Sequence, residues 1–356
     1  MKSILVDCER MKYPNTGPYH FCMNLANQLL KYKSEDENFS FLVPPKLNGF
    51  FGNQVGYEKI KLINKLYLPW SQSRFMTGTK KFDVWHMTYQ STMYCPFSKK
   101  TKAVLTILDL NFLHEHPDSE KNKKYLGLIQ NRVDRADYIA TISNFGLEDV
   151  KKHLKLGTKP ASVIYIGCSF NNLQVFEAPS YKPKRPFLFG LGTVLPKKNF
   201  HVLPCLLQGN DFELIIAGID SSTYKARIIE EAKRFNVEGR LTFTGPVSEE
   251  EKTWYYMNCQ AFLFPSIAEG FGLPVIEAMY HGKPVFISTH TSLPEVGGEH
   301  AYYFKDFSPE TIQLAFEAGM NHYQRVHPEE LIKKWALRFN WANTARSYLD
   351  VYRSLA

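Results

Sequence analysis

Short apolar runs alternate with helix-length amphipathic stretches along nearly the whole chain. This alternation is typical of parallel sheets whose strands are joined by crossover helices. In the first half, the predicted strands are Ile4–Asp7, Phe39–Val43, Lys59–Ile63, Val84–Met87, Val104–Leu108, Tyr138–Ile142 and Ser162–Ile166. In the second half, they are Phe187–Leu191, Glu213–Ala217, Leu241–Thr244, Ala261–Phe264, Pro284–Ile287 and Ala301–Phe304. We therefore predict an α/β protein with two doubly wound parallel-sheet domains that face a central cleft, where such sheets bind ligands.

The domain boundaries follow from the segment between the two series. Residues 171–186 are polar and proline-bearing and lack a period, so they are the predicted linker. The first domain is then 1–170 and the second 187–335, and 356 residues are enough to give each its own core. Residues 336–356 are expected to form a C-terminal helix that packs back toward the first domain.

Composition is that of a globular protein, with 44% hydrophobic and 22% charged residues. No stretch approaches the roughly 18 to 20 apolar residues of a membrane-spanning helix. The chain turns acidic at Asp7, too early for a signal peptide, and its six cysteines are scattered like reduced thiols. The expected location is the cytoplasm, with peripheral attachment to the cytoplasmic face of a membrane left open.

Positive charge is concentrated in the first half. Residues 1–165 hold 24 Lys and Arg against 15 Asp and Glu, whereas the remainder holds 19 against 20. The excess favours an anionic partner, such as an anionic membrane surface or a pyrophosphate-linked acceptor, but an ordinary solvated surface explains it equally well. Nucleic acid is not expected, because the excess is diffuse and no recognition motif accompanies it.

Two glutamates eight positions apart, Glu269 and Glu277, surround the start of a predicted helix. Glu269 follows a buried strand and a Pro-Ser turn, and Leu273-Pro274 places proline at the first helical position. Free amides at a helix start attract phosphate, and a carboxylate accepts hydrogen bonds from a vicinal diol. The motif therefore predicts a site for a sugar nucleotide, with amides from Phe271, Gly272 and Leu273.

A second motif follows the strand Phe187–Leu191, where Gly192-Thr193 leads to Lys197 and Lys198. Glycines permit close backbone approach, and ammonium groups near a helix start reinforce diphosphate binding. Paired lysines are commonly surface residues. The interpretation gains weight here because the glutamate loop closes a later strand of the same domain.

Other polar residues also close predicted strands. Gly17 after strand one would let a first-domain loop approach a ligand, or it marks an ordinary turn. His86 and Asp109 are candidates for acceptor chemistry, and for His86 a hydrogen-bonded packing role is the alternative. His114 and His116 lack a third ligand and no Asp-x-Asp motif occurs, so no metal is expected.

The chain resembles the retaining glycosyltransferases of the large family 4, which have the GT-B fold of two Rossmann-like domains. The resemblance covers essentially the full length and is densest at residues 187–296. Besides the glutamate motif, its landmarks are Gly192-x5-Lys198-Asn199, Thr141–Phe145, Val163–Gly167, Thr242–Val247 and Ser292–Val296.

The resemblance implies a role for each residue. Lys198 would bind the donor diphosphate, Glu277 the ribose hydroxyls and Glu269 the transferred sugar. The remaining donor-binding positions would be Gly17, Thr193, Lys197, Gly245, Val247, Gly270, Phe271, Gly272 and Leu273. The residues expected to take part in catalysis are Lys198, Glu269, His86 and Asp109.

Two positions depart from the family pattern. Many relatives have Arg at Thr193, so Lys197 would replace that cation. Many also have His at Leu108, and whether His86, His114 or no histidine substitutes stays open.

The resemblance implies metal-independent, retaining transfer of a hexose from GDP-mannose or a UDP-hexose. The acceptor would be a saccharide or lipid-linked saccharide in surface polysaccharide synthesis, and no cofactor is expected. The alternatives are a catalytically silent nucleotide-sugar-binding partner subunit and a sugar-nucleotide epimerase.

Overall fold

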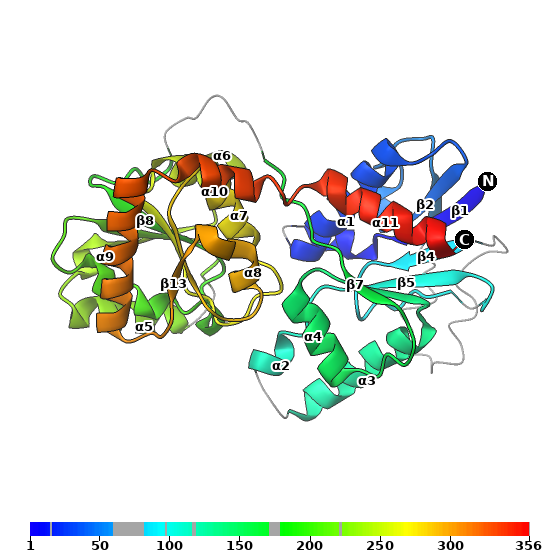
Figure 1. The fold of residues 1–356 in the computed structure, drawn as a ribbon, viewed down its shortest axis with the longest axis horizontal. Helices are drawn as coiled ribbons and strands as arrows, with labels where there is room; N and C mark the ends of the chain where they lie inside the picture. The colour runs from blue at the N-terminus through cyan, green and yellow to red at the C-terminus, as the bar shows by residue number, and fades with distance from the viewer. Residues whose placement is uncertain are drawn as a thin grey trace. The chain divides into compact units, whose positions relative to one another are not determined.

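A computed structural model describes residues 1–14, 16–59, 82–96, 98–115, 119–170, 179–220 and 223–355. The chain forms two compact units, coloured along the chain in Figure 1. Unit 1 is Met1–Gly167 with Asn340–Ala356, and unit 2 is Cys168–Phe339. The division falls three positions before the predicted end of the first domain, and residues 336–339 stay with unit 2. Positions 171–178 of the predicted linker lie outside the described residues.

Within the described part of unit 1, seven parallel strands form one sheet in the order β3-β2-β1-β4-β5-β6-β7. The strand order reverses between β1 and β4, because β2 and β3 lie on one side of β1 and the later strands on the other. The strands are β1 Lys2–Asp7, β2 Glu37–Val43, β3 Gly56–Lys59, β4 Val84–Met87, β5 Lys102–Ile107, β6 Tyr138–Thr141 and β7 Ala161–Val163. The connecting helices are η1 Glu9–Lys12, α1 Gly17–Tyr32, η2 Pro45–Leu47, α2 Phe112–Glu115, α3 Glu120–Arg135 and α4 Asn144–His153.

Within the described part of unit 2, six parallel strands form a sheet in the order β10-β9-β8-β11-β12-β13. Here the order reverses between β8 and β11. The strands are β8 Phe187–Leu191, β9 Glu213–Ala217, β10 Leu241–Gly245, β11 Ala261–Phe264, β12 Val285–Ser288 and β13 Tyr302–Phe304.

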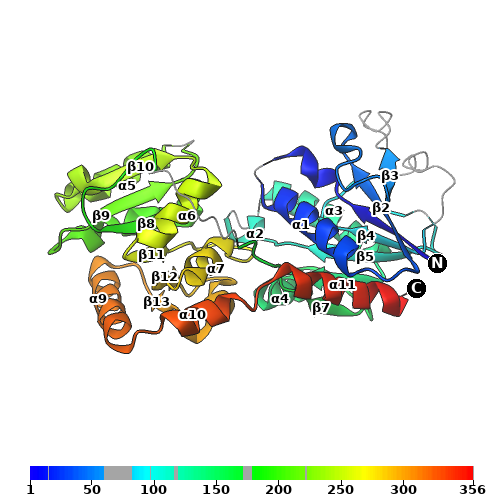
Figure 2. The same ribbon diagram turned by 90° about the horizontal axis from the view of Figure 1, so that it is seen from above.

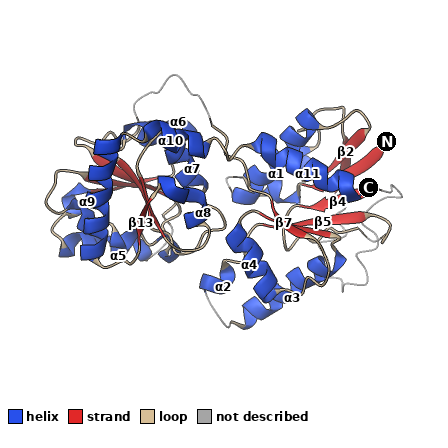
Figure 3. Ribbon diagram, viewed as in Figure 1, coloured by secondary structure: helices blue, strands red, loops and turns tan. Residues whose placement is uncertain are grey.

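Helices cover the sheet of each unit (Figure 3). In unit 2 the α-helices are α5 Tyr224–Arg234, α6 Glu249–Asn258, α7 Leu273–Tyr280, α8 Leu293–Gly297, α9 Pro309–Val326 and α10 Glu329–Ala336. Its 3-10 helices are η5 Pro196–Lys198, η6 Phe200–Val202, η7 Pro204–Leu207, η8 Glu238–Arg240 and η9 Gly298–His300. Capping residues in the sequence explain where several helices start. Ser248 and Glu251 form a capping box at α6, and Thr16 caps α1 by accepting from Tyr19 N.

The last helix, α11 Trp341–Leu355, belongs to unit 1 and packs along α1, as Figures 1 and 2 show. Gly167 meets its first turn so closely that an added Cβ would lie 2.2 Å from Trp341 N. Trp341, Tyr348 and Tyr352 are buried. The absence of a side chain at Gly167, in the loop after β7, therefore lets the helix dock.

The structure confirms the predicted doubly wound parallel sheets. Each predicted strand overlaps an observed one, and most ends agree within two residues. There are two exceptions. β7 ends at Val163, three residues before the predicted Ile166, and β3 covers Gly56–Lys59, whereas positions 60–63 of its predicted range lie outside the described residues. Among the described residues, no helix is long and apolar enough to span a membrane.

Candidate active site

The strand-order reversal of unit 2 brings Lys198 and Glu269 together. Lys198 ends η5 after β8, and Glu269 lies in the loop after β11, the neighbouring strand. Lys198 Nζ lies 2.5 Å from Glu269 Oε1 and 4.6 Å from the centre of the Phe264 ring. The two charged side chains are 13% and 15% exposed, so they form a partly buried ion pair. The predicted adjacency of the two motifs is therefore present in the fold.

Hydrogen bonds between loops hold this pair in place. Ile267 N and Ser266 Oγ both donate to Lys197 O, at 2.8 and 3.0 Å. Ser292 Oγ donates to Glu269 O at 3.0 Å and to Phe271 O at 2.7 Å. These bonds tie the loop after β11 to the loop after β8 and to the start of α8, and so they fix the position of the acidic loop.

Glycines are required where the loops approach each other. Gly218 has φ of 138°, and an added Cβ would lie 2.2 Å from Gly192 O. Gly192 has φ of 150°, and its Cβ would lie 3.1 Å from Lys198 Cε. Any side chain at either position would displace the backbone or the lysine.

Helix α7 starts beside this pair. Gly272, with φ of 122°, precedes Leu273 and Pro274 as its N-cap. The first N–H groups of an α-helix have no partner within the helix, and the helix dipole makes its start attractive to anions. Gly270 and Leu273 are half-buried, while Phe271 is buried with its ring 5.6 Å from that of Phe339.

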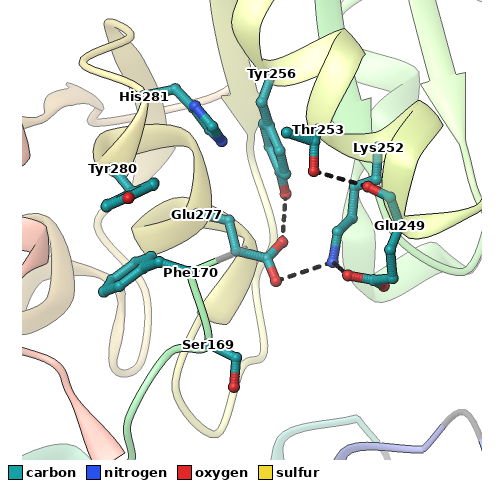
Figure 4. Close-up of a pocket in the computed structure, with 9 residues that line it drawn as sticks. All are labelled: Ser169, Phe170, Glu249, Lys252, Thr253, Tyr256, Glu277, Tyr280 and His281. Atoms are coloured by element: carbon teal, nitrogen blue, oxygen red, sulfur yellow. Dashed lines mark hydrogen bonds and ion pairs between the residues drawn. The ribbon is translucent and has the colours of Figure 1, made fainter. Parts of the chain in front are cut away.

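Glu277 lies within α7 and forms one wall of a pocket (Figure 4). Lys252 Nζ donates to Glu277 Oε1 at 3.1 Å, and Tyr256 OH donates to Oε2 at 2.8 Å. Lys252 also pairs with Glu249 at 2.9 Å, so one ammonium lies between two carboxylates. The pocket encloses about 290 Å³, open solvent included, and is lined by Ser169, Phe170, Glu249, Lys252, Thr253, Tyr256, Glu277, Tyr280 and His281.

The pKa of both side chains that donate to Glu277, Lys252 and Tyr256, is raised. Burial lowers the pKa of Lys252, but the Glu277 and Glu249 carboxylates outweigh it and raise the pKa above its ordinary value. Burial, and then Glu277, raise the pKa of Tyr256, so its hydroxyl stays a donor. A carboxylate has about four lone-pair sites, and the two described donors leave Glu277 able to accept from a diol.

Lys252 and Tyr256 are the residues that sequence reasoning missed. They stand four positions apart on α6 and therefore share one helix face, which is a signal in the sequence. That this face meets Glu277 on α7 is a tertiary contact, and no local pattern encodes it.

The other predicted donor residues lie at or just after the carboxyl ends of strands. Thr193 and Lys197 follow β8, and both are half-buried. Gly245 ends β10 with φ of 74°, and its carbonyl accepts from Gly218 N at 2.8 Å. Val247 is half-buried in the turn before α6. Their roles toward a ligand stay predictions.

His86 is a correction to the predicted catalytic set. Its side chain is fully buried in unit 1, with Nδ1 2.6 Å from Tyr352 OH and Nε2 2.7 Å from Thr106 Oγ1. Burial lowers its pKa to about 3. His86 is therefore a neutral, buried side chain whose two ring nitrogens are both engaged, and it has the packing role. The reason is that α11 covers the end of β4, which was expected to be open to a ligand.

The remaining first-unit candidates stay accessible. Asp109 is half-buried, and its Oδ1 accepts from Asn111 N at 3.0 Å. Gly17 is exposed at the start of α1, and an added Cβ would meet nothing within 4 Å. His114 Nε2 lies 2.5 Å from Asp149 Oδ2, whereas His116 lies outside the described residues. Among the described ranges, no group of three His, Cys, Asp or Glu could hold a metal ion.

Comparison with known proteins finds a family that unit 2 matches. Residues 174–333, nearly all of unit 2, match the family described as Glycosyl transferases group 1. The match covers 160 of the 356 residues and therefore concerns unit 2. Finer membership in family 4 stays a prediction.

The chain is 27% identical over 242 residues to the serotype-specific mannosyltransferase WbdA of Escherichia coli. That match covers 62% of the chain but 29% of WbdA, so the chain spans less than a third of that relative. The chain is also 27% identical over 277 residues to the O-antigen chain mannosyltransferase B of Escherichia coli. That match covers 71% of each protein.

Among solved structures, it is similar to sucrose-phosphate synthase from Thermosynechococcus elongatus, with a TM-score of 0.74 at 16% identity. That similarity covers 100% of this chain and 99% of the synthase. At this identity the likeness concerns the fold alone, and it confirms the predicted GT-B fold.

Proposed function

We propose that the protein is a metal-independent, retaining glycosyltransferase that moves a hexose from a nucleoside-diphosphate sugar to a saccharide or lipid-linked saccharide acceptor. The observation that carries the proposal is the Lys198–Glu269 pair at the strand-order reversal of unit 2. Doubly wound sheets bind ligands outside the carboxyl ends of their strands at such a reversal. Two relatives are named as mannosyltransferases, one of them of the O-antigen chain, so we propose mannose and surface polysaccharide synthesis first.

In the proposed reaction, the bond between the anomeric carbon and the diphosphate breaks, and negative charge grows on the departing diphosphate. Lys198 and the N–H groups at the start of α7 would stabilise this charge more strongly as it develops. A bond then forms from the acceptor hydroxyl oxygen to the anomeric carbon on the same face, and the hydroxyl proton passes to the departing phosphate. The sugar therefore keeps its anomeric configuration.

The Lys198–Glu269 pair supports an exchange when the donor binds. Without donor, each group neutralises the other, which avoids an unpaired, partly buried charge. A diphosphate would draw the ammonium toward itself and leave the carboxylate to accept from the sugar hydroxyls. Glu277, held by Lys252 and Tyr256, would accept from the ribose diol.

The decisive test is Lys198→Ala. We expect turnover to fall by about 10²–10³, the usual effect of losing one such donor, while the circular dichroism spectrum stays that of the wild type. Release of sugar from GDP-mannose and from UDP-hexoses, with and without saccharide acceptors, measures the rate. Lys225→Ala is the matched control, because Lys225 also has a carboxylate, Asp220, and an aromatic ring, Phe243, as contacts. Unchanged turnover in Lys198→Ala would remove Lys198 from the mechanism.

A panel of sugar nucleotides in thermal-shift assays identifies the donor and tests the silent-subunit alternative. Binding at a hundred times the dissociation constant stabilises a protein by about 2.7 kcal/mol. Stabilisation without hydrolysis or transfer under any condition would favour the catalytically silent partner subunit.

We also propose a cytoplasmic location at the face of an anionic membrane, supported by the 24 basic against 15 acidic residues among positions 1–165. Co-sedimentation with anionic vesicles, lost in high salt and absent with neutral vesicles, is the expected result. Equal sedimentation with both vesicle types would contradict it.

A further inference from the structure

The sheet of unit 1 also reverses its strand order, between β1 and β4, and a cation lies there as well. Arg10 stands in η1, directly after β1, and Tyr89 and Ser91 follow the end of β4. The guanidinium carbon lies 3.8 Å from the centre of the Tyr89 ring, and Nη2 donates to Ser91 Oγ at 3.3 Å. Doubly wound sheets bind ligands where their strand order reverses, as proposed for Lys198 in unit 2. In unit 1 the residue at that place is Arg10.

Arg10 uses little of its hydrogen-bonding capacity. A guanidinium has five N–H donors, and the bond to Ser91 is the one that Arg10 makes to a described residue. Its Nε is buried without a partner there. Buried polar groups in native proteins are nearly always satisfied, so an arginine left in this state calls for an acceptor that the chain itself does not supply.

Arg10 forms no ion pair with an acidic group among the described residues, although burial raises the pKa of Asp7 and the charge of Arg10 acts to lower it. Glu9 forms an ion pair with Lys12. Asp7 accepts from Thr92 Oγ1 and from Glu9 N, and burial raises its pKa to about 7, so much of it is uncharged near neutral pH. The positive charge of Arg10 thus remains available to a ligand.

The Ser91 hydroxyl that Arg10 contacts belongs to a group of neighbouring hydroxyls. Tyr125 OH, from α3, donates to Ser91 Oγ at 3.0 Å and lies 3.5 Å from Tyr89 OH. Gln90 fixes the loop after β4 to the loop after β5, because its Nε2 donates to Asp109 O at 3.0 Å and its Oε1 accepts from Leu108 N at 3.2 Å. Aromatic rings and hydroxyls beside a planar cation suit a sugar that carries an oxyanion.

We propose that Arg10, with Tyr89, Ser91 and Tyr125, binds an oxyanion on the saccharide acceptor, either a phosphate or a carboxylate attached to the sugar. The assignment of this ligand as the acceptor rests on the proposed glycosyl transfer. Arg10 would select charged acceptors over neutral ones, and the hydroxyls would hold the sugar beside the anion.

Titration calorimetry on the full chain tests the proposal, with the unit 2 site first saturated by the nucleoside diphosphate that stabilises the protein most. The probes are a hexose 1-phosphate, the corresponding hexuronate and the neutral methyl hexoside. We expect the wild type to bind at least one charged probe more tightly than the methyl hexoside. Whether the phosphate or the carboxylate probe binds identifies the source of the anion.

Arg10→Gln should weaken binding of the charged probe about tenfold or more, because a charge-assisted contact is lost. Arg10→Lys keeps the charge without the planar fork and should give an intermediate loss. Lys12→Gln, two positions away, is the matched control and should bind like the wild type. Equal affinity in Arg10→Gln and wild type, or no saturable binding of either charged probe to the wild type, would overturn the proposal.

The two proposals fail separately. If no nucleotide binds the wild type, the donor assignment fails, yet the dependence of the charged probe on Arg10 is still measurable. If nucleotides bind and the charged probe ignores Arg10, the inference alone fails. Lys198→Ala should leave binding of the charged probe unchanged, which excludes the donor phosphate site as its location.

Discussion

In unit 2, the orientation of Glu277 depends on the side chains that donate hydrogen bonds to it. Glu277 would accept hydrogen bonds from both hydroxyls of a ribose diol only with its carboxylate in one orientation. Lys252 and Tyr256 each hold one of its oxygens by a hydrogen bond. Lys252 is 17% exposed on its side chain and serves Glu249 as well. Its loss therefore leaves the partly buried Glu277 and the exposed Glu249 without their shared cation.

Lys252→Met keeps the length of the side chain and removes the charge. We expect nucleoside diphosphate affinity to fall about tenfold, or roughly 1.4 kcal/mol, because Glu277 loses its orientation. Discrimination against a 2′-deoxyribose analogue should shrink at the same time, which a merely structural lysine would not cause. Calorimetry measures both, and Lys151→Met, from an exposed pair with Glu148 on α4, is the control. An unchanged ratio between ribose and deoxyribose ligands would contradict the positioning role.

Alanine substitutions at Gly218 and Gly17 should have different effects, the first on stability and the second on turnover. Gly218→Ala puts a Cβ 2.2 Å from Gly192 O at a φ of 138°, so we expect a loss of about 1–3 kcal/mol in unfolding free energy. Gly17→Ala meets nothing within 4 Å and should leave stability unchanged while lowering turnover, if the donor approaches there. Urea denaturation and donor turnover distinguish the two. Wild-type stability in Gly218→Ala would show that the loops can separate without cost.

At the scale of elements, α11 is fixed to unit 1 by specific polar contacts. Thr106 Oγ1 lies 2.7 Å from both His86 Nε2 and Tyr348 OH, and His86 Nδ1 reaches Tyr352 OH. Near the chain end, Arg353 Nε and Nη2 donate to the two oxygens of Glu37 at 2.7 and 3.1 Å. These bonds set the rotation of the helix, and the buried aromatic rings supply the apolar contact.

Arg353→Gln should lower stability at neutral pH by about 1.5–3 kcal/mol, the usual worth of a hydrogen bond to a charged group. Burial raises the pKa of Glu37, but Arg353 and Ser34 N outweigh it and lower the pKa below the ordinary 4.5. A carboxyl with a depressed folded-state pKa stabilises above its unfolded pKa and loses that effect as pH falls through the folded value. Urea unfolding of wild type and variant should therefore differ at pH 7 and converge below pH 4.5. A gap independent of pH would contradict the ion pair.

At the scale of the whole molecule, unit 1 is built from two separated stretches of chain. The chain leaves it after Gly167, forms unit 2, and returns at Asn340 to supply α11. Unit 2 is continuous and has its own core, which includes Leu188, Phe200, Leu214, Leu263 and Phe286. The two units should therefore respond differently to loss of the chain end.

Removal of residues 340–356 should destabilise unit 1 and spare unit 2. The deletion exposes the buried surface of Phe21 and leaves His86 without its Tyr352 partner. Hydrogen exchange should show lost protection in β1, β4 and α1, with β8, β9 and β11 protected as in the wild type. Nucleoside diphosphate binding should persist in the truncated chain. Equal protection of unit 1 in both chains would contradict this role of α11.

The sequence determined the strands, their parallel arrangement and the edge where Lys198 and Glu269 meet. Strand periodicity is local, and parallel strands bring their carboxyl ends to one edge. Tertiary structure alone decided which side chains are buried or paired. His86 looked like a strand-end ligand, but its partner Tyr352 is 266 positions away. Lys252 meets Glu277 across 25 positions, and Arg10 meets Ser91 across 81. Burial and charge pairing depend on neighbours in space, and a linear pattern records neighbours along the chain.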